Sequence, residues 1–345
     1  MNSDNVNLDW ASLPFGYHRT DYNVRCVYRN GEWGEIEVHT SEEITLHMAA
    51  SCLHYGQEVF EGQKAFRGVD GRIRLFRIEE NARRFADSAR GIAMQPMPEE
   101  LFIKMARMAI KLNERWVPPY GSGCSLYLRP IEIGITPRVG VSAADEYVVI
   151  MFVTPVGAYF KNGFSTSKVV IYREYDRAAP QGTGRWKVGG NYAGGMVATM
   201  RAKKDGYSAV LFLDPKEKKY LDECGPANFF AIKGDAYVTP KSNSILPSVT
   251  NKSLQQLAKD MGLRVECRPV PVEELAEFDE AAECGTAAVA APISQVDDVD
   301  RGVSYVIARD NKPGPVITKL YKQLQAIQYG ESPDPYGWCT FIDND

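Results

Sequence analysis

The chain has 345 residues, of which 44% are hydrophobic, and carries a formal net charge of -4 with a pI near 5.8. This length and composition suffice for one large core or for two domains. The acidic balance argues against a nucleic-acid or membrane-surface partner, and no apolar run approaches the ~20 residues of a membrane span.

The N-terminal segment and the cysteines exclude further classes. The first ten residues contain neither a basic nor an apolar stretch, so no secretory signal peptide is predicted. The seven cysteines are scattered and none forms Cys-x-x-Cys, which favours neither a zinc site nor a disulfide framework. With only four histidines, no metal is expected. Reduced thiols favour a cytoplasmic protein.

The first half of the chain has the pattern of several strands and two helices. Alternation and apolar runs predict strands at residues 22–38, 72–77, 126–130 and 146–154. Apolar spacing and charge order predict helices at residues 79–90 and 99–115. Tyr55 and Phe60 lie in an aromatic segment closed by Gly62, where core packing and pocket lining are equally good interpretations. Arg129 lies among apolar residues, where an arginine usually needs an acidic partner or an anionic ligand.

The second half is predicted to form another domain. Residues 155–163 have the pattern of a linker, which divides the chain into domains at 1–154 and 164–345. Strands are predicted at residues 168–175 and 207–214, with two or three more within 220–240, and helices at 191–204, 250–262 and 315–328. Gly206 and Gly262 suit helix ends, and Thr250 is the candidate N-cap.

Three stretches of small and polar residues are candidates for a functional site. Residues 181–195 place six glycines around Lys187, which is either a solvated lysine in a flexible loop or a lysine facing a pocket. Residues 248–250 lie at the start of a predicted helix and are a candidate anion site. Residues 283–288 form a turn of small residues that is a second candidate of this kind. The dinucleotide fingerprint, the phosphate-binding loop and the Gly-x-Ser-x-Gly elbow are all absent. A lysine with arginines, tyrosines, threonines and one acid suits a phosphate-bearing cofactor held as an imine.

Six segments in order carry a resemblance to one family. They are LHYGQEVFEG (53–62), LYLRP (126–130), KVGGNY (187–192), LDECGPANF (221–229), LPSVT (246–250) and GTA (285–287). Together they resemble the branched-chain amino acid aminotransferases, which are fold type IV pyridoxal-phosphate enzymes. The resemblance extends roughly from residue 20 to residue 330, and it favours the pocket-facing interpretation of Lys187.

The resemblance implies a fold and a cofactor site. The fold is a two-domain α+β/α/β arrangement similar to D-amino acid aminotransferase, with pyridoxal 5'-phosphate at the domain interface. Lys187 matches the lysine that forms the imine, Glu223 the acid that faces the pyridine nitrogen, and Tyr192 the tyrosine that donates to the phenolate oxygen. The phosphate contacts match Arg84, Val249, Thr250 and Thr286.

The resemblance also implies a substrate site. Tyr127 and Arg129 match the pair beside the substrate α-carboxylate, which backbone N–H groups of Thr286 and Ala287 also hold. The apolar side-chain pocket matches Tyr55 and Phe60, and a loop that reaches the partner subunit's site matches Val139 and Val141. A homodimer is therefore expected.

The expected activity is that of a branched-chain-amino-acid transaminase of branched-chain amino acid biosynthesis. It moves the amino group of leucine, isoleucine or valine to 2-oxoglutarate, giving L-glutamate, by a ping-pong cycle. The alternatives are another fold type IV enzyme, namely a D-amino acid aminotransferase or an aminodeoxychorismate lyase, or a non-catalytic pyridoxal-phosphate-binding protein. The pair Tyr127-x-Arg129 argues against the first two, and the intact lysine and glutamate argue against the third.

Overall fold

The chain divides into two compact units. The computed structural model describes residues 6–160 and 163–342. Unit 1 comprises the described residues of Met1–Tyr159, Trp186–Gly189 and Ala326–Asp345. Unit 2 comprises the described residues of Phe160–Arg185 and Gly190–Gln325. The two-domain bounds expected from the sequence differ from these units in two segments, because both 186–189 and the C-terminal residues group with unit 1. Residues 161 and 162 of the expected linker lie outside the described residues.

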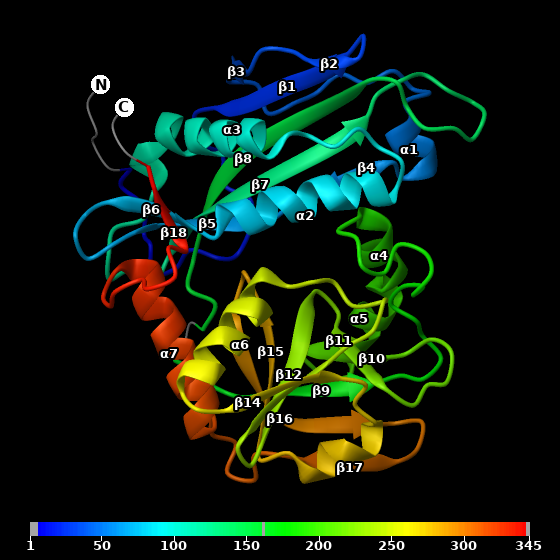
Figure 1. Cartoon of the computed structure of the whole chain (residues 1–345), viewed down its shortest axis with the longest axis vertical. Coiled ribbons are helices and arrows are strands. Elements are labelled where there is room, and N and C mark those ends of the chain that lie inside the picture. Colours follow the sequence, from blue (N-terminus) through cyan, green and yellow to red (C-terminus); the bar gives the residue numbers. More distant parts are fainter. Residues whose placement is uncertain (1–5, 161–162, 343–345) are drawn as a thin grey trace. The chain divides into compact units, whose positions relative to one another are not determined.

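Unit 1 is built on an antiparallel sheet with nine strands among the described residues (Figure 1). The order is β18-β6-β5-β7-β8-β1-β2, with β3 paired to β1 and β4 paired to β7. The strands are β1 (Asn23–Arg29), β2 (Glu32–Trp33), β3 (Glu37–His39), β4 (Glu58–Phe60), β5 (Gln63–Arg67), β6 (Ile73–Phe76), β7 (Ser125–Gly134), β8 (Tyr147–Val156) and β18 (Cys339–Phe341). The long strands β7 and β8 pair over their whole lengths and form the centre of the sheet.

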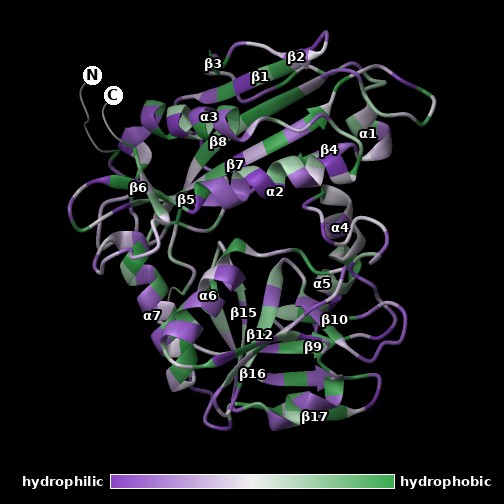
Figure 2. Cartoon of the chain, viewed as in Figure 1, coloured by the Kyte–Doolittle hydropathy of each residue, from purple (hydrophilic) through white to green (hydrophobic). Residues whose placement is uncertain are grey.

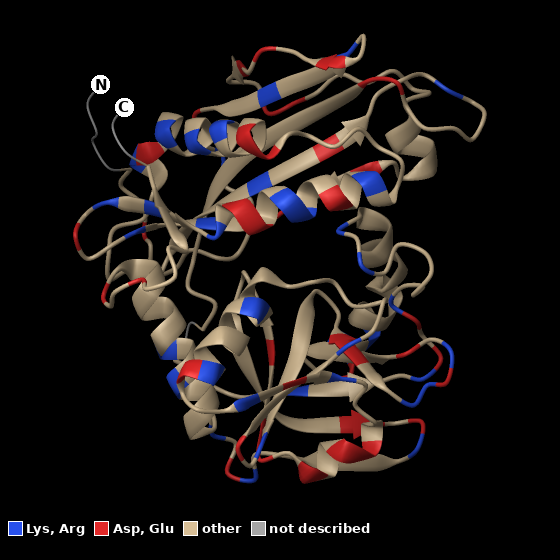
Figure 3. Cartoon of the chain, in the orientation of Figure 1, with Lys and Arg blue, Asp and Glu red and all other residues tan. Residues whose placement is uncertain are grey.

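Two amphipathic helices, α2 (Ile78–Gly91) and α3 (Glu99–Leu112), cover one face of this sheet. Both have two glutamates in the first turn and a basic residue in the last turn, as the helix dipole favours. Figure 3 shows acidic and basic residues alternating along α2. Their apolar sides meet through the rings of Phe85 and Phe102, whose centroids are 5.1 Å apart. The short helix α1 (Ser51–Tyr55) ends at Gly56, where φ is 59°.

The helix expected at 99–115 is shorter in the structure. It ends at Leu112 and is followed by a 3-10 turn at Glu114–Trp116. The buried side chain of Asn113 donates to the carbonyls of Tyr22 and Ala109 and accepts the N–H groups of Asp21 and Tyr22. These bonds tie the helix end to the N-terminal chain, which periodicity along the helix could not reveal.

Unit 2 contains a mixed sheet, also of nine strands within the described residues. The order is β11-β10-β9-β16-β15-β12-β13-β14, with β17 paired to β16. The strands are β9 (Ser167–Ile171), β10 (Ala209–Leu213), β11 (Leu221–Cys224), β12 (Ala227–Lys233), β13 (Ala236–Pro240), β14 (Arg264–Arg268), β15 (Glu280–Gly285), β16 (Val289–Asp298) and β17 (Val303–Val306). Figure 2 shows β9 and β10 to be largely hydrophobic; β10 is buried along its whole length, and β9 is buried from residue 169 to residue 171.

The helices after β9 are α4 (Gly189–Gly194), α5 (Met196–Lys204), α6 (Val249–Asp260) and α7 (Pro315–Tyr329), with a 3-10 turn at Val272–Glu277. The single helix expected at 191–204 is two helices, because the chain is interrupted at Gly195. The prediction that Thr250 is the N-cap of this helix is wrong. Ser248 caps α6, since its hydroxyl accepts the N–H of Asn251 at 3.2 Å.

Within residues 6–160 and 163–342, no helix is both long enough and apolar enough to cross a membrane. In the same ranges, no group of three or more His, Cys, Asp or Glu side chains could hold a metal ion.

Glu132 is an acidic residue that lies in the core of unit 1. It lies on β7 opposite Val59 and Val149, and its side chain is fully buried. Neither carboxyl oxygen has a hydrogen-bond partner among the described residues. Burial raises the pKa of the Glu132 carboxyl well above its ordinary value.

We predict that Glu132→Leu stabilises the protein, and that the gain increases with pH. The carboxyl pKa is raised in the folded state, so the unfolded chain ionises first and the wild type loses stability as pH rises above about 4. An unsatisfied buried polar group costs about 1–3 kcal/mol. Urea unfolding at pH 5 and pH 8 measures the gain. The control Glu132→Gln should remove the pH dependence while leaving a polar group buried. A leucine variant no more stable than wild type at pH 8 contradicts the prediction.

Candidate functional site

The backbone of Lys187 is fixed from two sides within unit 1. Its N–H donates to the hydroxyl of Ser88 on α2 at 2.9 Å. Its carbonyl accepts the N–H of Phe60 on β4 at 3.1 Å. With both polar groups of one residue engaged, the direction in which the side chain leaves the backbone is constrained.

The neighbours of Lys187 strengthen this attachment. The indole of Trp186 packs so closely on the end of α2 that a Cβ atom at Gly91 would lie 2.4 Å from it. Only glycine permits that approach. On the other side, the N–H of Gly189 donates to the carboxylate of Glu58 on β4. The segment Trp186–Gly189 therefore groups with unit 1, although the chain before and after it belongs to unit 2.

Two of the residues predicted from the sequence, Lys187 and Arg129, lie beside the ring of a third, Phe60. The amine of Lys187 lies 4.7 Å from the centroid of the Phe60 ring, and the guanidinium of Arg129 lies 5.1 Å from it. Arg129 also donates to the hydroxyl of Tyr127 at 3.4 Å. Its Nε is buried without a hydrogen-bond partner among the described residues. A partly buried arginine with one buried, unsatisfied donor is suited to an anionic ligand.

Arg84 forms an ion pair that the sequence did not indicate. Its guanidinium binds both oxygens of Glu61, at 2.7 and 2.9 Å, and Asn81 donates to the same carboxylate at 2.7 Å. Burial raises the pKa of Glu61, but the charge and hydrogen bonds of Arg84, together with the charge of Lys187, outweigh it and leave the pKa below its ordinary value. An anion at Arg84 therefore has to share this arginine with a carboxylate.

The remaining predicted residues of unit 1 lie at its surface. The hydroxyl of Tyr55 donates to the carbonyl of Val139. Val139 and Val141 are 88% and 86% exposed, which is unusual for two apolar side chains in one loop. Phe15, which sequence reasoning missed, contacts the ring of Tyr127 edge-on at 5.4 Å. No local pattern singled it out.

In unit 2, Glu223 is a buried carboxylate held in one orientation. It accepts the N–H of Leu246 at 3.0 Å and the side-chain amide of Asn228 at 2.9 Å. Arg177, which the sequence analysis also missed, lies 2.8 Å from it. Burial raises the pKa of Glu223, and the charge of Arg177 and these hydrogen bonds oppose that rise.

The other predicted residues of unit 2 lie at turns and helix starts. Val249 and Thr250 are the first two residues of α6, where N–H groups lack intrahelical acceptors and the dipole favours an anion. Thr286 and Ala287 form the turn between β15 and β16. Tyr192 lies in α4. The N–H groups at the start of α6 are therefore suited to bind an anion.

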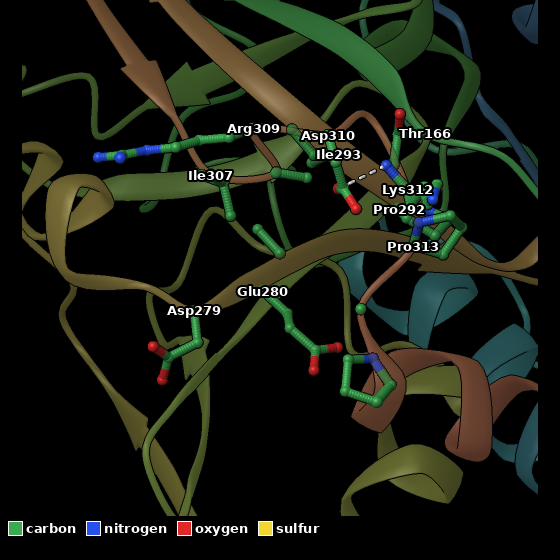
Figure 4. Close-up of a pocket in the computed structure, with 14 residues that line it drawn as sticks. Thr166, Asp279, Glu280, Pro292, Ile293, Ile307, Arg309, Asp310, Lys312 and Pro313 are labelled. Atoms are coloured by element: carbon green, nitrogen blue, oxygen red, sulfur yellow. Dashed lines mark hydrogen bonds between the residues drawn. The ribbon is translucent and has the colours of Figure 1, made fainter.

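A separate cavity of unit 2 lies near the start of α7 (Figure 4). It measures 540 Å³ and contains none of the predicted site residues. Its glutamate, Glu280, already accepts the N–H groups of Val316 and Ile317 at 3.0 and 2.8 Å. We therefore assign Glu280 to capping α7 and place the candidate chemistry elsewhere.

Comparison with known proteins identifies similar chains. A family model described as amino-transferase class IV matches residues 58–296. A Helicobacter pylori protein named branched-chain-amino-acid aminotransferase is 44% identical over 335 residues, which cover 96% of this chain and 97% of that one.

Solved structures are similar over almost the whole chain. The branched-chain amino acid aminotransferase of Escherichia coli has a TM-score of 0.78 and 25% identity, covering 94% of this chain and 100% of that one. A second branched-chain amino acid aminotransferase, whose source is abbreviated T.th., is complexed with N-(5'-phosphopyridoxyl)-L-glutamate. It has a TM-score of 0.74 and 25% identity, covering 92% of this chain and 98% of that one.

We predict that Gly91→Val destabilises the protein by about 1–3 kcal/mol, the usual cost of overpacking a close contact. The added atoms would collide with the Trp186 indole. Urea unfolding followed by tryptophan fluorescence measures the loss. The matched control is Gly190→Val in α4, where an added Cβ meets no atom within 4 Å. Equal stability of the two variants would show that the Trp186 contact does not limit position 91.

Proposed function

Because this chain belongs to the class IV aminotransferase family, we propose that it moves amino groups between branched-chain L-amino acids and 2-oxoglutarate by a ping-pong cycle. The amino acids are leucine, isoleucine and valine, and the second product is L-glutamate. The observation that carries the proposal is the position of the Lys187 amine and the Arg129 guanidinium beside the same Phe60 ring. The names of the similar proteins support the choice of substrate class.

We propose pyridoxal 5'-phosphate as the cofactor, since the side chains present fit it. An amine that can form an imine is supplied by Lys187, and a buried carboxylate that can hold a ring N–H is supplied by Glu223. Phosphate and phenolate oxygens would be bound by Arg84, Val249, Thr250, Thr286 and Tyr192. When bound, the cofactor supplies an electron-accepting ring that makes the proton on the substrate α-carbon removable.

Lys187 has two tasks in this proposal. Its amine would hold the cofactor, and the same amine would carry the proton away from the substrate α-carbon. A proton carrier has to stay within hydrogen-bond reach of the reacting atom. The bonds from Ser88 and Phe60 to the Lys187 backbone restrict where the amine can move.

Arg129 and Tyr127 bind the substrate α-carboxylate in this proposal. The unsatisfied Nε of Arg129 supports it, because a carboxylate would give this donor an acceptor. Backbone N–H groups of Thr286 and Ala287 complete the carboxylate contacts. The substrate side chain contacts Phe60 and Tyr55, and the same pocket has to admit the second carboxylate of 2-oxoglutarate in the other half-reaction.

We further propose a homodimer in the cytoplasm. The exposed side chains of Val139 and Val141 support the dimer, because two apolar residues at a loop tip would be covered by a partner subunit. The seven cysteines are all unpaired, which supports a reducing compartment.

The proposed function predicts both a substrate preference and a labelled residue. Steady-state kinetics with 2-oxoglutarate should show leucine, isoleucine and valine to be better donors than L-alanine or any D-amino acid. Each buried methylene contributes about 0.8 kcal/mol to binding. Borohydride reduction of the holoenzyme followed by peptide mapping should place the cofactor on Lys187. A preference for D-alanine, or a label elsewhere, would refute the proposal.

We predict that Glu223→Gln retains the fold and much of the cofactor but slows the half-reaction with L-leucine. Glutamine lacks the charge that keeps a proton on the ring nitrogen, and a charge-assisted bond of about 1.5–3 kcal/mol corresponds to roughly a 10- to 150-fold loss of rate. Single-turnover kinetics measures this loss. Glu283→Gln is the matched control, because Glu283 is a buried glutamate of the same sheet. A Glu223→Gln rate within about twofold of wild type would remove Glu223 from the mechanism.

A further inference from the structure

Arg177 is a buried arginine in the unit that carries Glu223. It is 8% exposed, and its Nη2 lies 2.8 Å from Oε1 of Glu223. The same nitrogen donates to the carbonyl of Gly184 at 2.7 Å and to the carbonyl of Ser244. One terminal nitrogen thus contacts three segments that are far apart in the sequence.

The segments that contain Gly184 and Ser244 are each close in sequence to a residue of the proposed site or to a hydrogen-bond partner of such a residue. Gly184 lies three positions before Lys187, and Ser244 lies two positions before Leu246, whose N–H donates to Glu223. The two segments touch directly, since a Cβ at Gly184 would lie 2.6 Å from the Cα of Ser244. Loss of Arg177 would therefore loosen the backbone around Glu223 as well as remove a charge.

The electrostatic surroundings of Glu223 depend on Arg177. Burial raises the pKa of the Glu223 carboxyl, and Arg177 supplies the largest opposing effect. The neighbouring carboxyl of Asp222 acts against Arg177, although Ser242 and Ser244 donate to Asp222. The thiols of Cys224 and Cys284 remain neutral, because burial raises their pKa values well above the ordinary range. Arg177 is thus the cation that favours an ionised Glu223.

A carboxylate beside a protonated ring nitrogen can exist in two forms with the same number of protons. Either the proton is on nitrogen and the carboxylate is charged, or the proton is on the carboxyl and both groups are neutral. Burial favours the neutral pair, because it disfavours separated charge. A second cation on the far side of the carboxylate favours the charged pair.

We propose that Arg177 is a positioning residue that keeps Glu223 ionised and oriented, so that the shared proton stays on the cofactor's ring nitrogen. This inference rests on the proposed function. It assigns to Arg177 a role that acts through Glu223 and involves no contact with the substrate.

The test uses holoenzyme reconstituted with pyridoxal phosphate labelled with ¹⁵N in the ring. The ¹⁵N chemical shift reports whether the nitrogen is protonated, independently of turnover. Wild type should show a protonated nitrogen at pH 7.5, and Arg177→Met should show an unprotonated one. The single-turnover rate with L-leucine should fall by roughly 10- to 150-fold, the range for one charge-assisted bond. A protonated nitrogen in Arg177→Met overturns the proposal.

Two further variants separate charge from structure. Arg177→Gln retains donors but loses the charge, so it should also give an unprotonated nitrogen, and it replaces Arg177→Met if that variant does not fold. A protonated nitrogen in Arg177→Gln overturns the role of the charge. Arg173→Met is the control for loss of an ion-paired arginine, because the partly buried Arg173 pairs with Asp298 in the same unit at 3.0 and 3.1 Å. It should leave the nitrogen protonated, and an unprotonated nitrogen there would refute a specific role for Arg177.

The proposed function and this inference can fail separately. A wild-type protein that binds the cofactor but does not transaminate L-leucine would refute the proposed substrate, while the ¹⁵N comparison would still decide the role of Arg177. A wild-type protein that does not bind the cofactor refutes both. A wild-type enzyme that transaminates L-leucine, with Arg177→Met like wild type in its ¹⁵N shift, refutes only the role of Arg177.

Discussion

The two hydrogen bonds that hold the backbone of Lys187 are the constraint on which the proposed site depends. They come from Ser88 on α2 and from Phe60 on β4, two elements whose places are set by the core of unit 1. The lysine side chain is flexible, but the point from which it extends is fixed by a helix and a strand. Because the backbone is already fixed, only the rotations of the side chain remain to be restricted when the amine reaches its target.

Three buried glutamates of this chain show how the partner decides what a carboxyl group does. Glu61 is ion-paired with Arg84, and its pKa lies below the ordinary value. Glu223 is paired with Arg177 but keeps a raised pKa, since burial outweighs the pair. Glu132 has no hydrogen-bond partner among the described residues, and burial alone raises its pKa. The same residue type thus anchors an arginine at position 61, is a candidate acceptor for a ring N–H at position 223, and destabilises the fold at position 132.

Successive side chains of β7 point alternately into the core of unit 1 and toward the face that carries the candidate substrate site. Leu126 and Leu128 are fully buried in the core of unit 1. Tyr127 and Arg129 point to the opposite face, as successive residues of a strand must. Phe60 pairs with Ile131 of the same strand, so its ring joins Arg129 on that face. Neighbouring residues can therefore contribute to stability and to substrate binding without conflict.

The sequence by itself indicated many of the local elements and the family. The helices predicted at 79–90 and 315–328 agree with α2 and α7 within one residue at each end. The motifs pointed to Lys187 and Glu223 and to the class IV aminotransferases, which the comparisons bear out for the family. The assignment of the individual site residues stays a prediction.

Only the tertiary structure decided how distant residues pair. It joined Arg84 to Glu61 and Arg177 to Glu223, and it grouped Trp186–Gly189 with unit 1. The members of each pair are separated by more than one element, so no spacing along the chain could indicate the contact. Strand order and helix packing bring them together, and these depend on how the whole core fills space rather than on any local pattern.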